Sequence, residues 1–91
     1  MLISARALAD LTAIQAYVGV DNPTAAAALV ARLMLRVRAL ELFAHLGRLV
    51  PEWSDPAVHE LIEGNYRIVY QVGGEAVDVL TVLEGHRRLV R

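Results

Sequence analysis

The residues of this chain best suited to chemistry are its arginines. All nine basic residues are arginine and none is lysine. A planar guanidinium binds phosphate or carboxylate through two parallel hydrogen bonds. Arginine in place of lysine also fits a GC-rich genome, so composition leaves both interpretations open. The candidate residues for binding another molecule are one arginine inside a strand-forming run and the basic residues of the C-terminal segment. They are Arg67, His86, Arg87, Arg88 and Arg91.

The composition is that of a folded protein of modest size. Hydrophobic residues make up 56% of the 91 residues and charged residues 21%, which predicts a single domain spanning residues 1–91. The absence of cysteine excludes disulfides, thiolate metal sites and a cysteine nucleophile. We predict no cofactor and no metal site. The net charge of −1 does not favour a general affinity for nucleic acid.

Membrane and export segments are not expected. The longest apolar run, around residues 25–31, is far shorter than the roughly 20 residues of a membrane span. The first residues lack the charged segment, long apolar core and cleavage site of a signal peptide. The sequence therefore predicts a soluble, cytoplasmic protein.

Two helices are predicted in the first half of the chain. Ser4 is a plausible N-cap of the first, which ends at Gly19. Its expected core stripe is Leu8, Leu11, Ile14, Tyr17 and Val18. Asn22 caps the second helix, which is predicted over Pro23–His45 with Gly47 as its C′ residue. Its expected core face is Leu29, Leu33, Val37, Leu40 and Ala44. The short connection predicts an antiparallel hairpin.

Three strands are predicted in the second half, after a loop over Gly47–Pro56 that carries Trp53. Tight turns at Gly64-Asn65 and Gly73-Gly74 separate them, which predicts an antiparallel meander. The predicted strands are Val58–Ile62, Tyr66–Val72 and Ala76–Leu83. A short strand at Leu2-Ile3 completes the order β-α-α-β-β-β. The fold class is α+β, with the hairpin packed on a small antiparallel sheet.

The middle strand places a charge on one of its faces. Tyr66, Ile68, Tyr70 and Val72 should share one face, and Arg67, Val69 and Gln71 the other. Arg67 is then either a solvated side chain or a residue held on a rigid strand for a purpose.

Five segments, in this order and spacing, resemble the RelE/ParE superfamily of toxins from type II toxin–antitoxin pairs. None is specific alone, and together they span nearly the whole chain: residues 9–18, residues 22–26, the run Gly47-Arg48-Leu49-Val50-Pro51-Glu52, residues 66–70 and residues 80–87. The resemblance implies an N-terminal strand, a helical hairpin and three antiparallel strands. The chain departs at its start, where the first strand is reduced to residues 1–4. A late start codon or a truncated edge strand would each explain this difference.

The ribonuclease branch of the superfamily cleaves messenger RNA in the ribosome and needs cations and proton-transfer groups on the sheet. Mapped residue by residue, Arg67 and Arg87 match, and His86 could transfer a proton. The family ribonucleases also carry lysines on the sheet. The corresponding positions here are approximately Val58 and Glu60, and neither side chain is a cation. If the protein is a ribonuclease, its catalytic candidates are Arg67, His86 and Arg87.

The ParE branch fits better. Its members are linked to poisoning of DNA gyrase and act by binding, without an agreed catalytic set. The pattern Gly-Arg-x-Val-Pro-Glu at residues 47–52 is more typical of this branch, and the missing lysines agree with it. The resemblance therefore implies a non-enzymatic toxin aimed at gyrase. A ribosome-dependent ribonuclease and a degenerate, non-toxic member remain the alternatives.

The resemblance also implies a cognate antitoxin, encoded alongside, whose tail folds on the toxin as it binds. The candidate docking surface is the helical hairpin, with exposed small residues along 25–28. Its candidate residues are Ala25, Ala28, Arg32 and Arg36. The two arginines, one turn apart, could meet an acidic tail or be solvated only. The chain shows no helix-turn-helix or ribbon-helix-helix pattern, so operator binding is not assigned to it.

Overall fold

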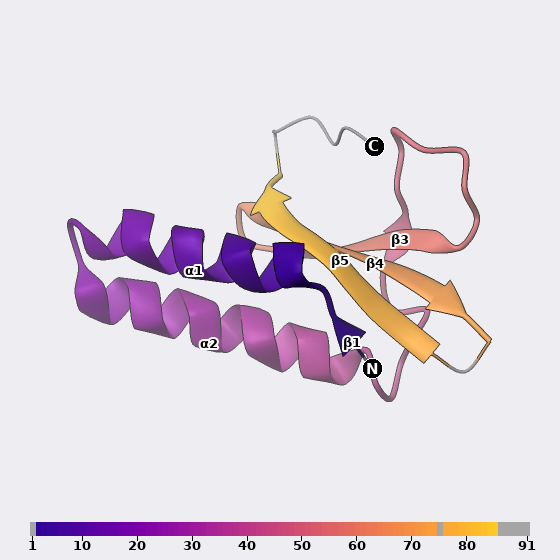
Figure 1. The fold of residues 1–91 in the computed structure, drawn as a ribbon, viewed down its shortest axis with the longest axis horizontal. Coiled ribbons are helices and arrows are strands. Elements are labelled where there is room, and N and C mark those ends of the chain that lie inside the picture. The colour runs from indigo at the N-terminus through magenta and orange to yellow at the C-terminus, as the bar shows by residue number, and fades with distance from the viewer. Residues whose placement is uncertain (1, 75, 86–91) are drawn as a thin grey trace.

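Two helices lie against one face of a five-stranded sheet in the computed structural model, which describes residues 2–74 and 76–85 (Figure 1). The elements, in chain order, are β1 (Leu2–Ile3), α1 (Ala5–Gly19), α2 (Pro23–Ala39), β2 (Arg48–Leu49), β3 (Val58–Glu63), β4 (Tyr66–Gly73) and β5 (Ala76–Glu84). Helices and an antiparallel meander segregate along the chain, which confirms the α+β class and the antiparallel hairpin.

The sheet has the order β1-β5-β4-β3-β2. The meander β3–β4–β5 is antiparallel, as predicted, and its strands begin and end within one residue of the expected bounds. Gly64 and Gly74 have φ near +58°, which only glycine adopts at little cost in these tight turns. A bulge between Val69 and Tyr70 shifts the register with β5.

Each helix begins at a side-chain cap, and both predicted caps are confirmed. The Ala7 N–H donates to Ser4 Oγ at 3.0 Å, and the Ala25 N–H donates to Asn22 Oδ1 at 3.0 Å. The Ser4 hydroxyl also donates to the Leu80 carbonyl at 2.7 Å, which ties the start of α1 to β5.

Replacing Ser4 with alanine should therefore cost more than replacing Asn22. We expect Ser4→Ala to lower the free energy of unfolding by about 1–2 kcal/mol, because a cap and a cross-link to the sheet are both lost. Asn22→Ala should cost about 1 kcal/mol, the usual value for a cap alone. Urea unfolding followed by the fluorescence of Trp53, the single tryptophan, measures both. Equal losses would show that the Leu80 contact contributes nothing.

The sheet separates two cores. The larger lies between sheet and helices and includes Leu11, Leu33, Val37, Ile68 and Tyr70, while Tyr66 and Val72 pack against it. The smaller lies on the other face, where no helix contributes, and consists of Val50, Val58, Val69 and Leu83 with Trp53 and Leu80 beside them. The alternation predicted for β4 is confirmed.

The second helix is shorter than predicted: α2 ends at Ala39, not His45. Beyond it the backbone bonds tighten from the i→i−4 to the i→i−3 type, with the Leu40 and Glu41 N–H groups donating to Val37 and Arg38. Leu40 is buried in the core although it lies beyond the helix. The helical spacing of apolar residues in the sequence therefore continues past the end of α2. Gly47 is not a helix cap, so that assignment was wrong.

Three further expectations need correction. The predicted loop 47–56 contains β2, whose two residues are too few to show alternation, so the sheet gains a strand. The strand β1 pairs with β5 in parallel, so the sheet is mixed and not wholly antiparallel. Leu8 and Tyr17 are exposed, because α1 turns Ala7, Leu11 and Ile14 toward the core and leaves those two flanking the stripe.

No helix within the described ranges is long and apolar enough to cross a membrane.

Candidate functional site

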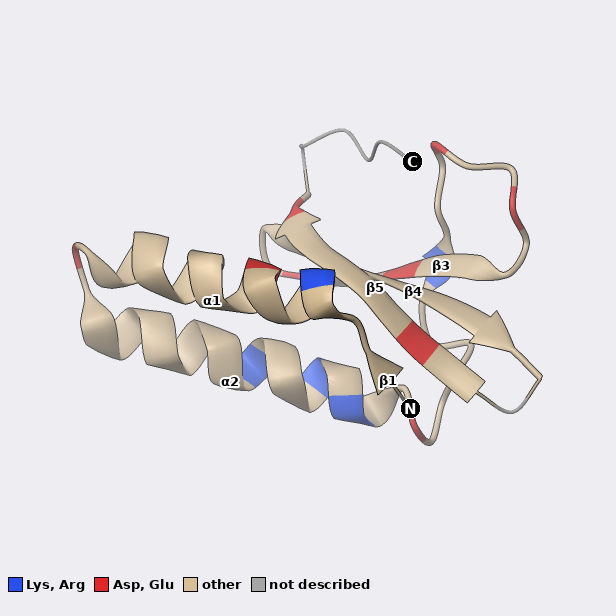
Figure 2. Ribbon diagram, in the orientation of Figure 1, with Lys and Arg blue, Asp and Glu red and all other residues tan. Residues whose placement is uncertain are grey.

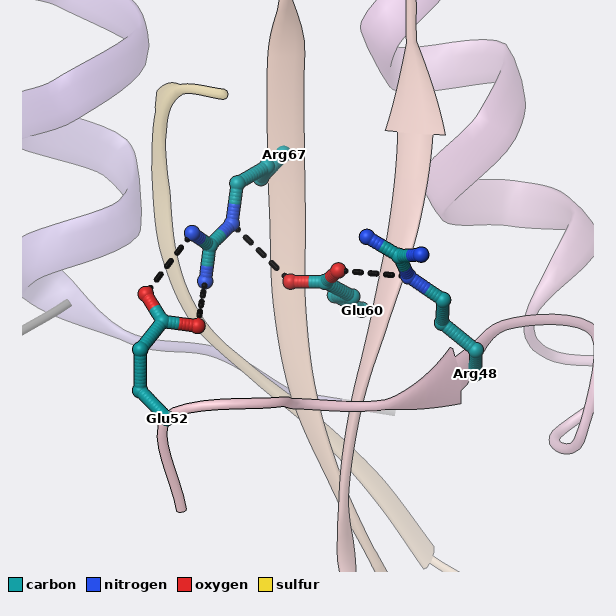
Figure 3. Close-up of polar contacts among 4 residues, drawn as sticks. All are labelled: Arg48, Glu52, Glu60 and Arg67. Carbon is teal, nitrogen blue, oxygen red and sulfur yellow. Dashed lines mark hydrogen bonds and ion pairs between the residues drawn. The ribbon is translucent and has the colours of Figure 1, made fainter. Parts of the chain in front are cut away.

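Four charged side chains form a chain of ion pairs on the sheet face that carries the smaller core (Figure 3). Three strands and the loop after β2 position them. Glu60 on β3 lies directly opposite Arg48 on β2, and Arg67 on β4 is one diagonal step away, since it pairs with Ile62. Glu52 comes from the loop. Strand register therefore brings three of the four side chains together.

The contacts of Arg67 with Glu52 and of Arg48 with Glu60 are charge-assisted hydrogen bonds, and the contact of Arg67 with Glu60 is an ion pair. Arg67 Nη1 and Nη2 lie 2.8 Å and 3.0 Å from the two carboxylate oxygens of Glu52, a bidentate pair. Arg67 Nε lies 2.9 Å from Glu60 Oε1. The other oxygen of Glu60 accepts from Arg48 Nε at 2.7 Å. Each carboxylate oxygen drawn in Figure 3 thus faces an arginine nitrogen.

Burial makes the middle of this network the critical part. The side chains of Glu60 and Arg67 are 1% and 7% exposed, whereas that of Arg48 is 68% exposed. The hydrogen bonds to Glu52 raise the pKa of Arg67 most, burial opposes this, and the charge of Glu60 raises the pKa further. Arg67 is accordingly a permanent cation held between two carboxylates.

The loop that supplies Glu52 is anchored to the sheet by apolar contacts as well. Val50 is buried in the smaller core, and Trp53 packs against that core. The Gly47 N–H donates to the Tyr70 hydroxyl oxygen at 2.9 Å. A Cβ at Gly47 would press into the Glu60 backbone, which explains the glycine. Residues of the pattern Gly-Arg-x-Val-Pro-Glu thus make the contacts that hold this loop on the sheet.

Chemically, the network is balanced. It contains two arginines and two glutamates, so its formal charge is zero. A phosphate approaching Arg67 would meet Glu52 and Glu60 before it could share the guanidinium. Such an arrangement is suited to holding a loop on a sheet, and it does not present the buried cation Arg67 to a nucleic acid.

The structure places the sequence candidates unevenly. Arg67 is buried in the ion-pair chain. The terminal candidates His86, Arg87, Arg88 and Arg91 lie outside the described residues. His59 is a partly buried strand residue whose ring stacks on Tyr70, with centroids 5.6 Å apart, and His45 meets its edge.

The antitoxin candidates come together on one stripe of α2. Ala25, Ala28, Arg32 and Arg36 follow one another at spacings of three and four residues, and the first three are exposed. Arg36 is half-buried and its Nε lies 3.5 Å from Glu63 Oε1. Within the alanine run Ala26 is buried, so the expectation that the whole run is exposed was wrong. Figure 2 shows basic residues gathered on the C-terminal half of α2.

Sequence reasoning missed the partners of Arg67. Glu60 entered only as a position that lacks a cation, and Glu52 only as the last residue of a motif. A carboxylate that follows a fixed Gly-Arg-x-Val-Pro pattern and a charged residue inside a strand were the available signals. Their pairing depends on the path of the loop, which local patterns do not specify. Among residues 2–74 and 76–85, no group of three or more candidate ligands could hold a metal ion.

Comparison with known proteins agrees with this architecture. A solved structure described as the chromosomal ParDE TA system from P. aeruginosa superposes with a TM-score of 0.72, at 27% identity, over 92% of this chain and 95% of that one. No curated protein gives a significant sequence match. Residues 1–89 match the family described as ParE toxin of type II toxin-antitoxin system, parDE. The chain therefore belongs to the ParE toxin family.

Proposed function

We propose that this ParE-family toxin arrests growth by binding DNA gyrase, without cleaving RNA, and that a cognate antitoxin neutralises it. Family membership supports the toxin role. The choice of a binding mechanism over RNA cleavage rests on one observation, the ion-pair chain around Arg67.

Ribonuclease chemistry on this sheet would need a cation free to bind the scissile phosphate. Arg67 is the one arginine on the β3–β4–β5 meander within the described residues, and Glu52 and Glu60 bind its guanidinium. Val58 and Glu60 occupy the positions where lysines would be needed. The sheet therefore favours a protein that acts by contact, and the basic segment His86–Arg91 is the candidate contact with gyrase.

The antitoxin proposal is supported by apolar surface. Leu42, Phe43, Leu46 and Leu49 follow one another closely in the chain and are between 45% and 80% exposed. These exposed side chains offer apolar surface that a partner can cover. An antitoxin tail that folds as it binds would cover such a surface and the α2 stripe together.

A supercoiling assay tests the proposal. We expect the purified chain to inhibit gyrase and to trap cleaved DNA, and we expect the antitoxin to reverse both effects. A folded chain that arrests growth and leaves gyrase unaffected would instead support ribosome-dependent RNA cleavage, with Arg67, His86 and Arg87 as the residues to replace. A folded chain that does neither would be a degenerate member of the family.

The terminal arginines can be tested separately. We expect Arg87→Ala combined with Arg88→Ala to weaken gyrase inhibition by about 10-fold or more, since two cationic contacts with the target are lost. Inhibition by the purified variant, measured across protein concentrations, gives the change. Arg38→Ala on α2 is the matched control and should leave inhibition unchanged. Full inhibition by the double variant would show that the C-terminal segment is not the contact.

A further inference from the structure

A pocket of about 380 Å³ lies between α1 and the ends of β4 and β5 that meet near the Gly64 turn and Gly85. It borders α1, whereas the ion-pair chain involves no helix residue. Its polar lining is Asp10 and Tyr17 from α1, Tyr66 from β4 and Glu84 from β5. Ile14 and Val82 are among the apolar residues between them. The pocket thus combines two carboxylates, two phenol rings and an apolar floor.

Asp10 is held in place from the sheet. Its Oδ2 accepts from the Val82 N–H at 3.0 Å and from the Thr81 hydroxyl. These residues are separated by more than 70 positions in the chain, so the contact also fixes α1 against β5. A carboxylate oriented in this way is preorganised to bind a donor that enters the pocket.

The charged residues in the described lining of the pocket, Asp10 and Glu84, are both acidic. Burial raises the pKa of the Tyr66 phenol most, and Glu84 and then Tyr17 raise it further. Within the described part of the lining, no residue is basic. A cation is therefore the charge that this pocket favours, whereas the phosphates of a nucleic acid would be repelled.

The mouth of the pocket is marked by an exposed ring. Tyr17 is 77% exposed, a large aromatic side chain at the outer face of α1. Aromatic faces attract cations, and an apolar floor suits the methylene stem of a long basic side chain. Val20, one turn further along and 82% exposed, extends the apolar surface beside it.

We propose that this pocket receives an arginine or lysine side chain of the antitoxin. The inference rests on the proposed neutralisation by an antitoxin. The basic group lies against Tyr17 and Tyr66, and the carboxylates of Asp10 and Glu84 balance its charge. We assign the pocket to the antitoxin because α1, which lines it, forms the helical hairpin together with α2. The candidate antitoxin stripe lies on α2, and a tail that wraps the hairpin would pass both helices.

Affinity measurements on the full chain test this. We expect Tyr17→Ala and Glu84→Gln each to weaken binding of the cognate antitoxin by about 30-fold, the effect of losing a central contact in a partner's pocket. Tyr17→Phe should restore wild-type affinity, because the ring and not the hydroxyl contacts the cation. Gln15→Ala on α1 is the matched control, exposed and outside the pocket, and should bind as the wild type does.

Salt dependence separates a charge contact from a packing effect. The Glu84→Gln variant should show a smaller loss of affinity with rising ionic strength than the wild type, because one attractive pair has been removed. Thermal unfolding should occur at the same temperature for Tyr17→Ala as for the wild type, since this ring is mostly exposed.

The outcomes are distinguishable. A wild-type chain that does not bind the antitoxin would contradict the proposed function itself. A wild-type chain that binds, together with Tyr17→Ala and Glu84→Gln variants that bind equally well, would overturn the pocket inference alone. Variants that keep antitoxin affinity and lose gyrase inhibition would assign the pocket to the target and overturn the antitoxin as its occupant.

Discussion

Arg67→Ala should lower the free energy of unfolding by about 3–5 kcal/mol, the usual cost of removing one partner from a buried ion pair. The substitution leaves Glu60, whose side chain is 1% exposed, without its buried cation, and releases Glu52 from its bidentate contact. The loop 50–56 would then lose its ion pair with β4 and keep its apolar contacts and the hydrogen bond from the Val50 N–H to the Val58 carbonyl. Urea unfolding followed by Trp53 fluorescence reports on this directly, because Trp53 packs beside the loop anchor.

Arg48→Ala is the matched control at the other end of the same chain of ion pairs. It removes a hydrogen bond to the same Glu60, yet its side chain is 68% exposed and Glu60 keeps Arg67. We expect a loss of about 1 kcal/mol, the value of one hydrogen bond, because water can reach the place of the exposed Arg48 side chain. If both variants unfolded at the same urea concentration, the buried part of the network would not be what holds the loop.

This pair of variants also guards against a misinterpretation of toxicity. Loss of growth arrest by the Arg67→Ala variant would not show that Arg67 is a catalytic cation. An unfolded toxin would also fail to arrest growth. Arg67→Lys keeps the charge and loses the fork that Glu52 binds. An intermediate loss of stability, with activity that follows the folded fraction, is the result expected of a structural arginine.

Gly47→Ala should lower the free energy of unfolding by about 3 kcal/mol, the upper end of the cost of overpacking. A Cβ at this position meets the backbone carbonyl of Glu60 and lies 2.9 Å from the Tyr70 hydroxyl. Backbone cannot move aside as a flexible side chain does, so β2 must separate from β3. The hydrogen bond from the Gly47 N–H to Tyr70 would be lost with it.

Gly73→Ala is the control for this substitution. Gly73 is the last residue of β4, and its φ is not positive. A methyl group added there would have no heavy atom within 4 Å. We expect its stability to be unchanged or raised by about 0.4–1 kcal/mol, because alanine restricts the unfolded chain. Urea unfolding of the two variants side by side gives the comparison. A Gly47→Ala protein as stable as Gly73→Ala would contradict the close approach of β2 to β3.

Local chemistry was sufficient for much of the fold. The caps Ser4 and Asn22 and the turn at Gly64 were correctly predicted, because each depends on the backbone of a few consecutive residues. The alternation along β4 was correct for the same reason, since neighbouring strand residues point to opposite faces whatever the rest of the chain does. The family resemblance also came from segments in register along the chain.

Other features exist only where distant segments meet. The apolar period could not show that α2 ends at Ala39, since Leu40 remains buried in a tighter turn. The two residues of β2 pair only because β3 is there. Arg67 was singled out on its strand, but its partners Glu52 and Glu60 lie 15 and 7 positions earlier and reach it through loop path and register. The pocket at Tyr17 likewise requires α1 to pack on β5. Local rules act within a few residues, whereas burial, ion pairing and pocket shape depend on which surfaces come together when the chain folds.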